Sequence, residues 1–377
     1  MNMKNACMIS CSDHYNHRLN VAAGYLESHG YEVTYITSDF DHFTKKTFRV
    51  EIPNSVQLHT RPYRRNLSLD RILSHRQFAR DVFRYLENLP KQPDVLVVLL
   101  PPNFLAKYAA AYKKRHPNVQ IVFDIFDLWP ETFPSGSVKK LLAPAFRVWS
   151  WLRDHNLGAA DHLITECEMF RQRLGLSSDE ATTVYLGADA PKCGILPVQL
   201  SDRQWDLCYL GSINNIIDIP KISALLQALA KERPVNLHIV GSGERLQELI
   251  TSAENAGAVA IYHGAVYEDL EKQQIMSGCH FGLNIVKESV CIGLTMKSVD
   301  YFRNGLPIIN NVPADTARII EAYGCGIELD EHTAEKLRGM DLQQCIQMRN
   351  NTCKLFKTCF ERAVIDRQYG EVLARIL

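Results

Sequence analysis

Short apolar runs alternate with amphipathic helical patterns along the whole chain of 377 residues. The first unit consists of an apolar run at Ala6–Ser10, a helical pattern at Leu19–His29 and a β-type run at Tyr31–Thr37. A strand, a crossing helix and a second strand predict parallel pairing with a right-handed crossover. Residues Val95–Leu100 are all apolar, which is typical of a strand buried on both faces of a parallel sheet. The sequence therefore predicts an α/β fold with doubly wound parallel sheets.

Glycine and proline interrupt this alternation at residues 187–204. Two glycines and two prolines fall close together there, which predicts a linker between domains. The alternation resumes at Asp206–Leu210 and continues to a polar, helical tail. We therefore expect two α/β domains of similar size that face each other across a cleft. Ligands of such sheets bind beyond the carboxyl ends of the strands.

The charges of the chain balance, since 42 Lys and Arg stand against 42 Asp and Glu. Nucleic-acid binding draws on a large surplus of cations, so the balance argues against a nucleic-acid partner. The sequence shows no signal-peptide pattern and no apolar run near the ~20 residues of a membrane helix. We expect a cytoplasmic protein whose contact with a membrane is limited to the inner face of the plasma membrane.

Basic residues gather between residues 61 and 84, where seven Arg are interspersed with aromatic and aliphatic side chains. This composition fits a surface helix attracted to anionic lipid. It also fits a site that binds a pyrophosphate-linked lipid acceptor through Arg forks, with Arg64 and Arg65 as candidates. The solvated face of ordinary core helices is the third interpretation.

Glycine follows four of the strands expected in the second half of the chain. Glycine lets the backbone approach a ligand closely, so four such turns in one domain predict a nucleotide or phosphate site. The P-loop pattern is absent, and the second turn lacks the third glycine of the dinucleotide fingerprint. The four turns are Gly211-Ser212, Gly241-Ser242-Gly243, Gly264-Ala265-Val266 and Gly293-Leu294-Thr295.

The last of these turns opens the most informative motif. Thr295 is a candidate N-cap for a helix that ends before Gly305. Lys297 would lie in the first turn, where a cation opposes the helix dipole unless an anion docks on the free N–H groups. A diphosphate meets that condition, and Asp300 on the same face can accept the hydroxyls of a ribose. The alternative is a plain i,i+3 ion pair between Lys297 and Asp300.

Candidate acceptor groups follow strands of the first domain. Asp127 comes after a buried strand and can orient an acceptor hydroxyl or take its proton, or it can cap the turn that follows. Glu131 lies just after Pro130, a position that also suits the electrostatics of a helix start. His14 and Arg18 belong to the polar loop and helix start after the first strand.

The stretches Thr295–Tyr301 and Gly305–Ile309 resemble the donor-site motif of family 4 and related GT-B glycosyltransferases. The turns at Gly211, Gly241 and Gly264 are similar to family segments in the same order. So are three segments of the first half, the last of which resembles the D-L-W-P-E loop of a bacterial polysaccharide-type subgroup: Ala159–Thr165, Val184–Asp189 and Phe126–Glu131.

The resemblance implies a GT-B fold with Rossmann-like domains at 1–190 (acceptor) and 191–359 (donor), and a C-terminal helix at about 360–377 that packs back on the first. It implies retaining transfer of a hexosyl unit from a nucleotide sugar, chiefly a UDP-sugar, to a glycan or lipid-linked acceptor in surface polysaccharide biosynthesis. Neither a metal nor a cofactor is expected, because Lys297 and the helix N-terminus would neutralise the leaving diphosphate.

The site residues that we expect fall into three groups. Asp127 and Lys297 are the catalytic candidates. The acceptor contacts are His14, Arg18, Arg64, Arg65 and Glu131. The donor contacts are Gly211, Ser212, Gly241, Gly264, Val266, Glu288, Gly293, Leu294, Thr295, Lys297 and Asp300.

The chain departs from the family pattern at two positions. Asp300 replaces the usual Glu, and Ile292 stands where the family has a second Glu that holds the donor sugar. Glu288 can substitute for it or be an ordinary loop carboxylate. Two other functions stay open on the sequence alone, a UDP-sugar epimerase of the same fold and a non-catalytic adaptor, which the isoleucine favours.

Overall fold

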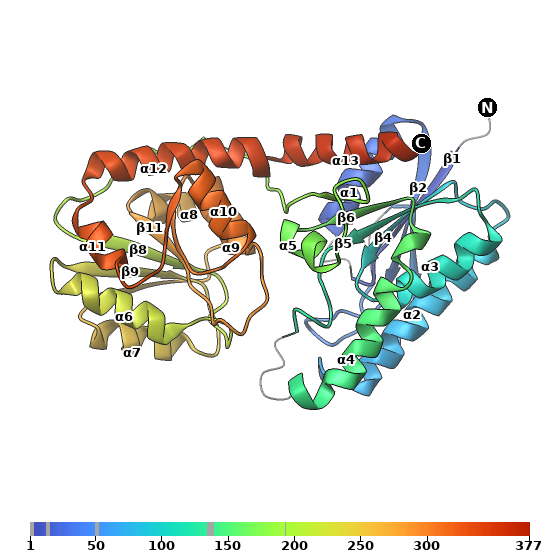
Figure 1. Cartoon of the computed structure of the whole chain (residues 1–377), viewed down its shortest axis with the longest axis horizontal. Helices are drawn as coiled ribbons and strands as arrows, with labels where there is room; N and C mark the ends of the chain where they lie inside the picture. The colour runs from blue at the N-terminus through green and yellow to red at the C-terminus, as the bar shows by residue number, and fades with distance from the viewer. Residues whose placement is uncertain (1–3, 13–15, 50–52, 134–138, 193) are drawn as a thin grey trace. The chain divides into compact units, whose positions relative to one another are not determined.

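The computed structural model describes residues 4–12, 16–49, 53–133, 139–192 and 194–377. The chain forms two compact units (Figure 1). Unit 1 comprises Met1–Tyr185 together with Ile365–Leu377, and unit 2 comprises Leu186–Val364. Each unit contains one parallel sheet with helices packed on it, which confirms the predicted α/β class with doubly wound sheets.

The sheet of unit 1 has seven strands in the order β3-β2-β1-β4-β5-β6-β7. All its pairs are parallel, and the central strand β4 is buried along its whole length, as its apolar run predicts. The strands are β1 (Lys4–Ile9), β2 (Tyr31–Ser38), β3 (Ser55–Leu58), β4 (Val95–Leu100), β5 (Gln120–Ile125), β6 (His162–Thr165) and β7 (Ala181–Thr183).

The helices of unit 1 lie in the connections between these strands, except the last, which is the C-terminal helix of the chain. They are α1 (Asn16–Ser28), α2 (Leu69–Glu87), α3 (Phe104–Arg115), α4 (Lys139–Asp154), the 3-10 turn η3 (Leu157–Ala159), α5 (Glu168–Arg173) and α13 (Arg362–Ile376). The last helix packs beside α1, because Gly370 leaves room for the ring of Tyr25 (Figure 1). Tyr369 and Leu373 of α13 join the same buried cluster as Met8 and Val97 of the central strands. The C-terminal helix is thus part of the core of unit 1.

The sheet of unit 2 has six parallel strands in the order β10-β9-β8-β11-β12-β13. The strands are β8 (Trp205–Leu210), β9 (Val235–Val240), β10 (Val259–Gly264), β11 (Phe281–Asn284), β12 (Ile308–Asn310) and β13 (Gly326–Glu328). The helices are α6 (Ile219–Ala230), α7 (Leu246–Asn255), α8 (Asp269–Ser277), α9 (Met296–Arg303), α10 (Asp315–Tyr323), α11 (Thr333–Arg338), α12 (Leu342–Leu355) and the π-helix η4 (Phe356–Phe360).

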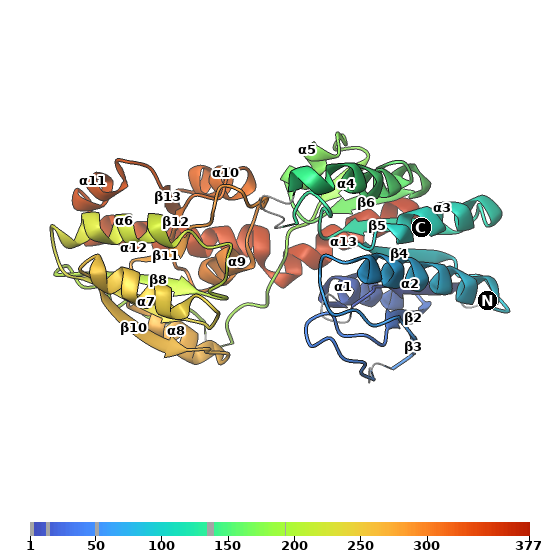
Figure 2. The same ribbon diagram turned by 90° about the horizontal axis from the view of Figure 1, so that it is seen from below.

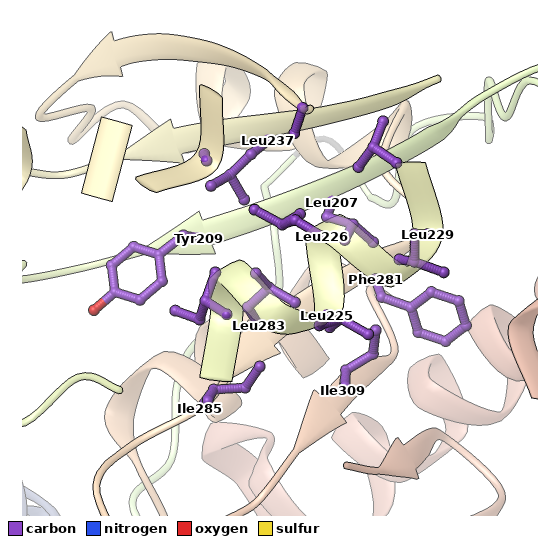
Figure 3. Packing of buried hydrophobic residues seen from close by; sticks show 14 of the residues in the cluster. Leu207, Tyr209, Leu225, Leu226, Leu229, Leu237, Phe281, Leu283, Ile285 and Ile309 are labelled. Carbon is purple, nitrogen blue, oxygen red and sulfur yellow. The ribbon is translucent and has the colours of Figure 1, made fainter. Parts of the chain in front are cut away.

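The core of unit 2 forms where α6 packs on the sheet. Figures 1 and 2 show α6 and α7 side by side on one face. Alternate residues of β8, Leu207 and Tyr209, belong to the same buried cluster as Leu225 and Leu229 of α6 (Figure 3). The inward-facing residues of the strand and of the helix therefore form one apolar layer. No helix in the described ranges combines the length and apolarity needed to cross a membrane.

Candidate functional site

Three glycine turns lie together at the carboxyl ends of β8, β9 and β10. These strands are neighbours in the sheet, so their ends meet at one edge. The N–H of Gly211 donates to the carbonyl of Val240 at 2.9 Å, and the N–H of Gly241 donates to the carbonyl of Gly264 at 2.7 Å. The turns therefore form one hydrogen-bonded rim, at the place where parallel sheets bind ligands.

Packing explains the second of these turns. A Cβ on Gly241 would lie 2.0 Å from the carbonyl oxygen of Gly211, and the φ of Gly241 is +146°. A Cβ on Gly243 would lie 2.2 Å from the carbonyl oxygen of Ile213. The glycines of this turn are thus required by the neighbouring backbone. Around Gly211 and Gly264 the space is open, so these two positions can admit a ligand.

The N-terminus of α9 is fixed by its cap, as the sequence predicts. Thr295 Oγ1 accepts a hydrogen bond from the Ser298 N–H at 3.1 Å and donates to Asn284 Oδ1 at 2.9 Å. Asn284 ends β11, so the cap ties the first turn of α9 to the edge of the sheet. The hydroxyl of Tyr301 accepts from the Leu210 N–H at 2.7 Å and fixes the same helix to the end of β8.

Lys297 lies in the first turn of α9, against Tyr209. Its Nζ is 3.2 Å from the hydroxyl and 4.3 Å from the ring centroid of Tyr209. Burial lowers the pKa of Lys297 to about 8. No described carboxylate pairs with it, and the alternative ion pair with Asp300 is not formed. A half-buried ammonium without a described counter-ion suits an anionic ligand.

Asp300 is half-buried one turn further along α9. Burial raises the pKa of its carboxyl group, and the nearby cations Lys272 and Arg303 oppose that shift. Among the described residues no hydrogen bond or ion pair holds this carboxylate, since Arg303 and Lys272 both pair with Asp269. It is therefore available to hydroxyl donors.

The other donor candidates have varied surroundings. The carbonyl of Gly293 accepts from the N–H and hydroxyl of Thr316, and Leu294 is buried. Ser212 is exposed and Val266 is half-buried near the glycine rim. Glu288 is exposed and pairs with Lys221 of α6 at 2.7 Å. Glu288 is thus an ordinary loop carboxylate that forms an ion pair with α6 at the surface.

In unit 1, Asp127 follows β5 and lines a cavity. Burial raises the pKa of Asp127, and hydrogen bonds from the side chains of Thr132 and Trp129 oppose that shift. These bonds hold the turn after β5, as the capping interpretation predicts. The carboxylate also faces the cavity, which is lined by Ser10, Cys11, Ser12, Ser38, Phe40, His42, Thr60, Tyr63, Arg71, Ser74, His75, Leu99, Pro101, Pro102, Phe126, Asp127 and Trp129.

The structure corrects two of the expected acceptor contacts. Arg18 is buried and forms an ion pair with Asp124 at 2.8 Å, so its guanidinium does not reach the surface. Glu131 pairs with the buried Arg153 at 2.9 Å and stabilises that cation instead of a helix start. Long-range partners decide both positions, and no local pattern shows them.

The remaining acceptor candidates are Arg64, Arg65 and His14. Arg64 and Arg65 are exposed and line a surface pocket with Lys45 and Arg61. His14 lies outside the described residues. Within the described ranges no group of His, Cys, Asp or Glu side chains is arranged to hold a metal ion.

The basic cluster at residues 61–84 included Arg71, but the sequence analysis did not single out Ser74 and His75, the other polar residues of α2 that line the cavity. Arg71, Ser74 and His75 are buried on the same helix face as Phe78. Their spacing of three and four residues places them on the inner, apolar stripe of α2. Polar residues at apolar-stripe positions are the signal that could have identified them.

Comparison with known proteins agrees with this architecture. Residues 19–190 match the family model of Glycosyltransferase Family 4. No curated protein matches the chain by sequence.

Several solved structures share the fold over the whole chain. The lipopolysaccharide outer core galactosyltransferase WaaB is 13% identical with a TM-score of 0.66, and 100% of each chain is covered. HepE from Anabaena, in complex with UDP, is 13% identical with a TM-score of 0.66 and coverage of 99% of this chain and 100% of its own. MurG from Acinetobacter baumannii is 12% identical with a TM-score of 0.56 and coverage of 99% of both chains.

At these identities the structural likeness shows the fold, and the family model supports the resemblance seen in the sequence. Residues 19–190 therefore match Glycosyltransferase Family 4, and the whole chain has the two-unit GT-B fold seen in solved glycosyltransferases.

Proposed function

We propose that the protein transfers a hexosyl unit from a UDP-sugar to a glycan or lipid-linked acceptor in surface polysaccharide biosynthesis. The observation that carries the proposal is the half-buried Lys297 in the first turn of a capped helix, with no carboxylate partner among the described residues. Solved structures of the same fold support the nucleotide, since HepE is described with UDP and with UDP-glucose.

Unit 2 would hold the donor. The diphosphate would dock on the free N–H groups of the first turn of α9 beside Lys297. The ribose hydroxyls would bind Asp300, and the backbone at Gly211 and Gly264 would contact the remainder of the nucleotide. Fixed donors and a half-buried cation stabilise the charge that develops on the leaving UDP, so we propose transfer without a metal ion. Retention of the anomeric configuration follows from the family resemblance.

Unit 1 would hold the acceptor. Asp127 would orient the acceptor hydroxyl and take its proton as the new glycosidic bond forms. Its raised pKa supports this role, because a base with a higher pKa binds the proton more firmly. Thr132 and Trp129 fix the carboxylate for this contact.

Calorimetry of UDP binding to Lys297→Ala tests the donor site. A charge-assisted hydrogen bond is worth about 1.5–3 kcal/mol, so we expect affinity to fall about tenfold to more than a hundredfold. Lys231→Ala is the matched control, since Lys231 is an exposed lysine of the same unit. Unchanged UDP affinity in Lys297→Ala would remove the phosphate role.

Incubation with a panel of UDP-sugars tests the reaction class. Slow release of UDP supports a transferase. Formation of an isomerised UDP-sugar would instead identify an epimerase, and binding without any turnover would identify an adaptor.

We also propose a cytoplasmic location with peripheral contact to the anionic inner face of the plasma membrane. The exposed Arg64 and Arg65 beside the exposed Leu69 support that contact. Co-sedimentation with phosphatidylglycerol vesicles should occur at low salt and weaken as salt rises. Absence of co-sedimentation at low salt would contradict it.

A further inference from the structure

Three hollows of unit 1 share lining residues near the start of α2. The polar cavity is the one lined by Asp127. The apolar groove runs between α2 and α4 and is lined by Asn66, Leu67, Ser68, Leu69, Arg71, Ile72, Phe104, Leu142, Ala145, Phe146, Val148, Trp149 and Leu152. The basic pocket contains Lys45, Arg61, Arg64 and Arg65. Arg71 lines the polar cavity and the apolar groove, and Tyr63 lines the polar cavity and the basic pocket.

The guanidinium of Arg71 is buried and forms no ion pair with a carboxylate of the described residues. Burial lowers the pKa of Arg71, although the charge of Asp127 in the same cavity and a hydrogen bond with Tyr63 both oppose that shift. Arg71 is 2% exposed and lies 4.1 Å from the ring centroid of Trp129. One Nη donates to the carbonyl of Asn66 at 3.0 Å, while Nε has no partner among the described residues. The two other buried arginines of the described part of unit 1, Arg18 and Arg153, each have carboxylate partners. Burial of a cation that forms no ion pair is costly, so Arg71 is suited to an anion supplied by a ligand.

The polar cavity offers further groups for such an anion. Ser74 Oγ, His75 Nδ1 and Ser12 Oγ are buried and find no hydrogen-bond partner among the described residues. The volume of this cavity is about 60 Å³, several times the ~10–15 Å³ that one water needs. It therefore has room for a small charged group that receives hydrogen bonds from hydroxyls and from the Arg71 fork.

A second cation lies close to this group. Lys45 Nζ is 4.7 Å from the ring centroid of Tyr63, and the guanidinium of Arg71 is 5.6 Å from the same ring. Burial and the charge of Arg71 both lower the pKa of Lys45. Two cations at one ring favour a ligand with more than one negative oxygen, and phosphate has this chemistry.

The apolar groove is the second hollow lined by Arg71. Its volume is about 550 Å³, and aliphatic and aromatic side chains dominate its walls. Leu69 is 78% exposed and Val148 is 61% exposed. Apolar side chains gathered in an open groove mark a binding surface for an apolar ligand.

We propose that the acceptor of this enzyme is a lipid-linked phosphate, with its phosphate at Arg71 in the polar cavity and its aliphatic chain in the groove between α2 and α4. This inference rests on the proposed function and names the class of its acceptor. A soluble phosphate would leave the groove uncovered, and a neutral lipid would leave Arg71 without an ion pair. Only a ligand with both parts complements both hollows.

Calorimetry of the full chain with farnesyl phosphate, farnesol and inorganic phosphate tests the proposal. We expect farnesyl phosphate to bind at least about tenfold more tightly than either of the others. Equal affinity for inorganic phosphate would show that the groove is not used. Equal affinity for farnesol would show that Arg71 does not select an anion. Either result would overturn the proposal.

Variants assign the two parts of the ligand to their hollows. Arg71→Gln should lower affinity for farnesyl phosphate about tenfold or more, while Arg76→Gln, an exposed arginine on the same helix, should not. Leu69→Ser with Val148→Ser should weaken farnesyl phosphate and leave inorganic phosphate unchanged. Leu73→Ser is the matched control, because Leu73 is exposed on α2 outside the groove. Equal losses in the variants and their controls would contradict the assignment.

Two further variants keep the test decisive if Arg71→Gln unfolds unit 1. Arg71→Lys keeps the charge but loses the fork, and Ser74→Ala removes one hydroxyl donor. Both should weaken farnesyl phosphate in protein whose circular dichroism is unchanged, and a lack of effect in both would overturn the proposal. Lys297→Ala should retain farnesyl phosphate binding. A wild-type protein that binds farnesyl phosphate but not UDP would count against the donor site alone, and one that binds UDP but not farnesyl phosphate would count against this inference alone.

Discussion

The ammonium of Lys297 lies 3.2 Å from the hydroxyl of Tyr209 and 4.3 Å from the centroid of its ring. The hydroxyl of Tyr209 donates to the carbonyl of Ser212, so it accepts from Lys297. The pair joins the first turn of α9 to the end of β8. A cation near an aromatic ring gains about 0.5–2 kcal/mol, yet this gain leaves its positive charge in place for a ligand.

Replacing Lys297 by Met should stabilise unit 2 in a pH-dependent way. The pKa of Lys297 is lowered to about 8 in the folded protein, below the ~10.4 of an exposed lysine. The unfolded chain therefore binds more protons between these values, and the free energy of unfolding of the wild type rises across that interval. We expect the gain of Lys297→Met to be full below about pH 8 and to vanish by about pH 10.4. Urea titrations at both ends check this, and a gain that is independent of pH would contradict it.

Replacing Asp300 by Asn should separate ribose binding from diphosphate binding. Loss of a charge-assisted acceptor should weaken UDP by about 1.5–3 kcal/mol, which is tenfold or more. Pyrophosphate has no ribose and should bind as before. Calorimetry with both ligands provides the measurement. Equal losses for UDP and pyrophosphate would mean that Asp300 acts on the phosphates or on the fold.

Replacing Asp127 by Asn should lower turnover by about 10²–10⁴-fold and leave UDP affinity intact, because a general base contributes about that much. Burial raises the pKa of Asp127, so the acid limb of the kcat profile should lie above the ~3.9 of an exposed aspartate. Activity should fall as pH drops through that raised pKa, since the carboxylate is then protonated. Initial rates of UDP release across pH test both statements. An acid limb that persists in Asp127→Asn would assign it to another group.

Replacing Gly241 by Ala should destabilise unit 2 more than replacing Gly211 by Ala. A Cβ at Gly241 meets the carbonyl oxygen of Gly211, whereas a Cβ at Gly211 meets open space. Both positions have positive φ, so the backbone strain is shared and only the clash differs. Overpacking costs about 1–3 kcal/mol, and we expect a difference of that size in urea unfolding. Equal losses would mean that the loop moves aside freely.

Replacing Asp124 by Asn should destabilise unit 1 by about 3–5 kcal/mol, because Arg18 would be left buried without its partner. The hydroxyl of Tyr369 also donates to Asp124, so the change should loosen α13 from the sheet. Glu371→Gln on the same helix removes an exposed charge and should cost no more than ~1 kcal/mol. Chemical unfolding measures both, and faster hydrogen exchange in α13 should accompany Asp124→Asn. Similar stability of the two variants would contradict the role of the buried pair.

The sequence by itself determined the features that depend on near neighbours. The alternation of strands and helices, the cap at Thr295 and the end of α9 before Gly305 all follow from patterns a few residues long. The helix N-terminus that carries Lys297 was therefore predictable. So was its place at a strand end, because every parallel strand leads into its helix at the same edge of the sheet.

Only the tertiary structure decided which charged side chains form ion pairs in the interior and which are buried without one. Arg18 meets Asp124 across 106 residues, and Glu131 meets Arg153 across 22. A lone arginine in the sequence looks the same whether it finds such a partner or, like Arg71, is buried without one. The difference depends on what packs around the guanidinium, and burial in a low-dielectric environment decides whether a charge is structural or open to a ligand.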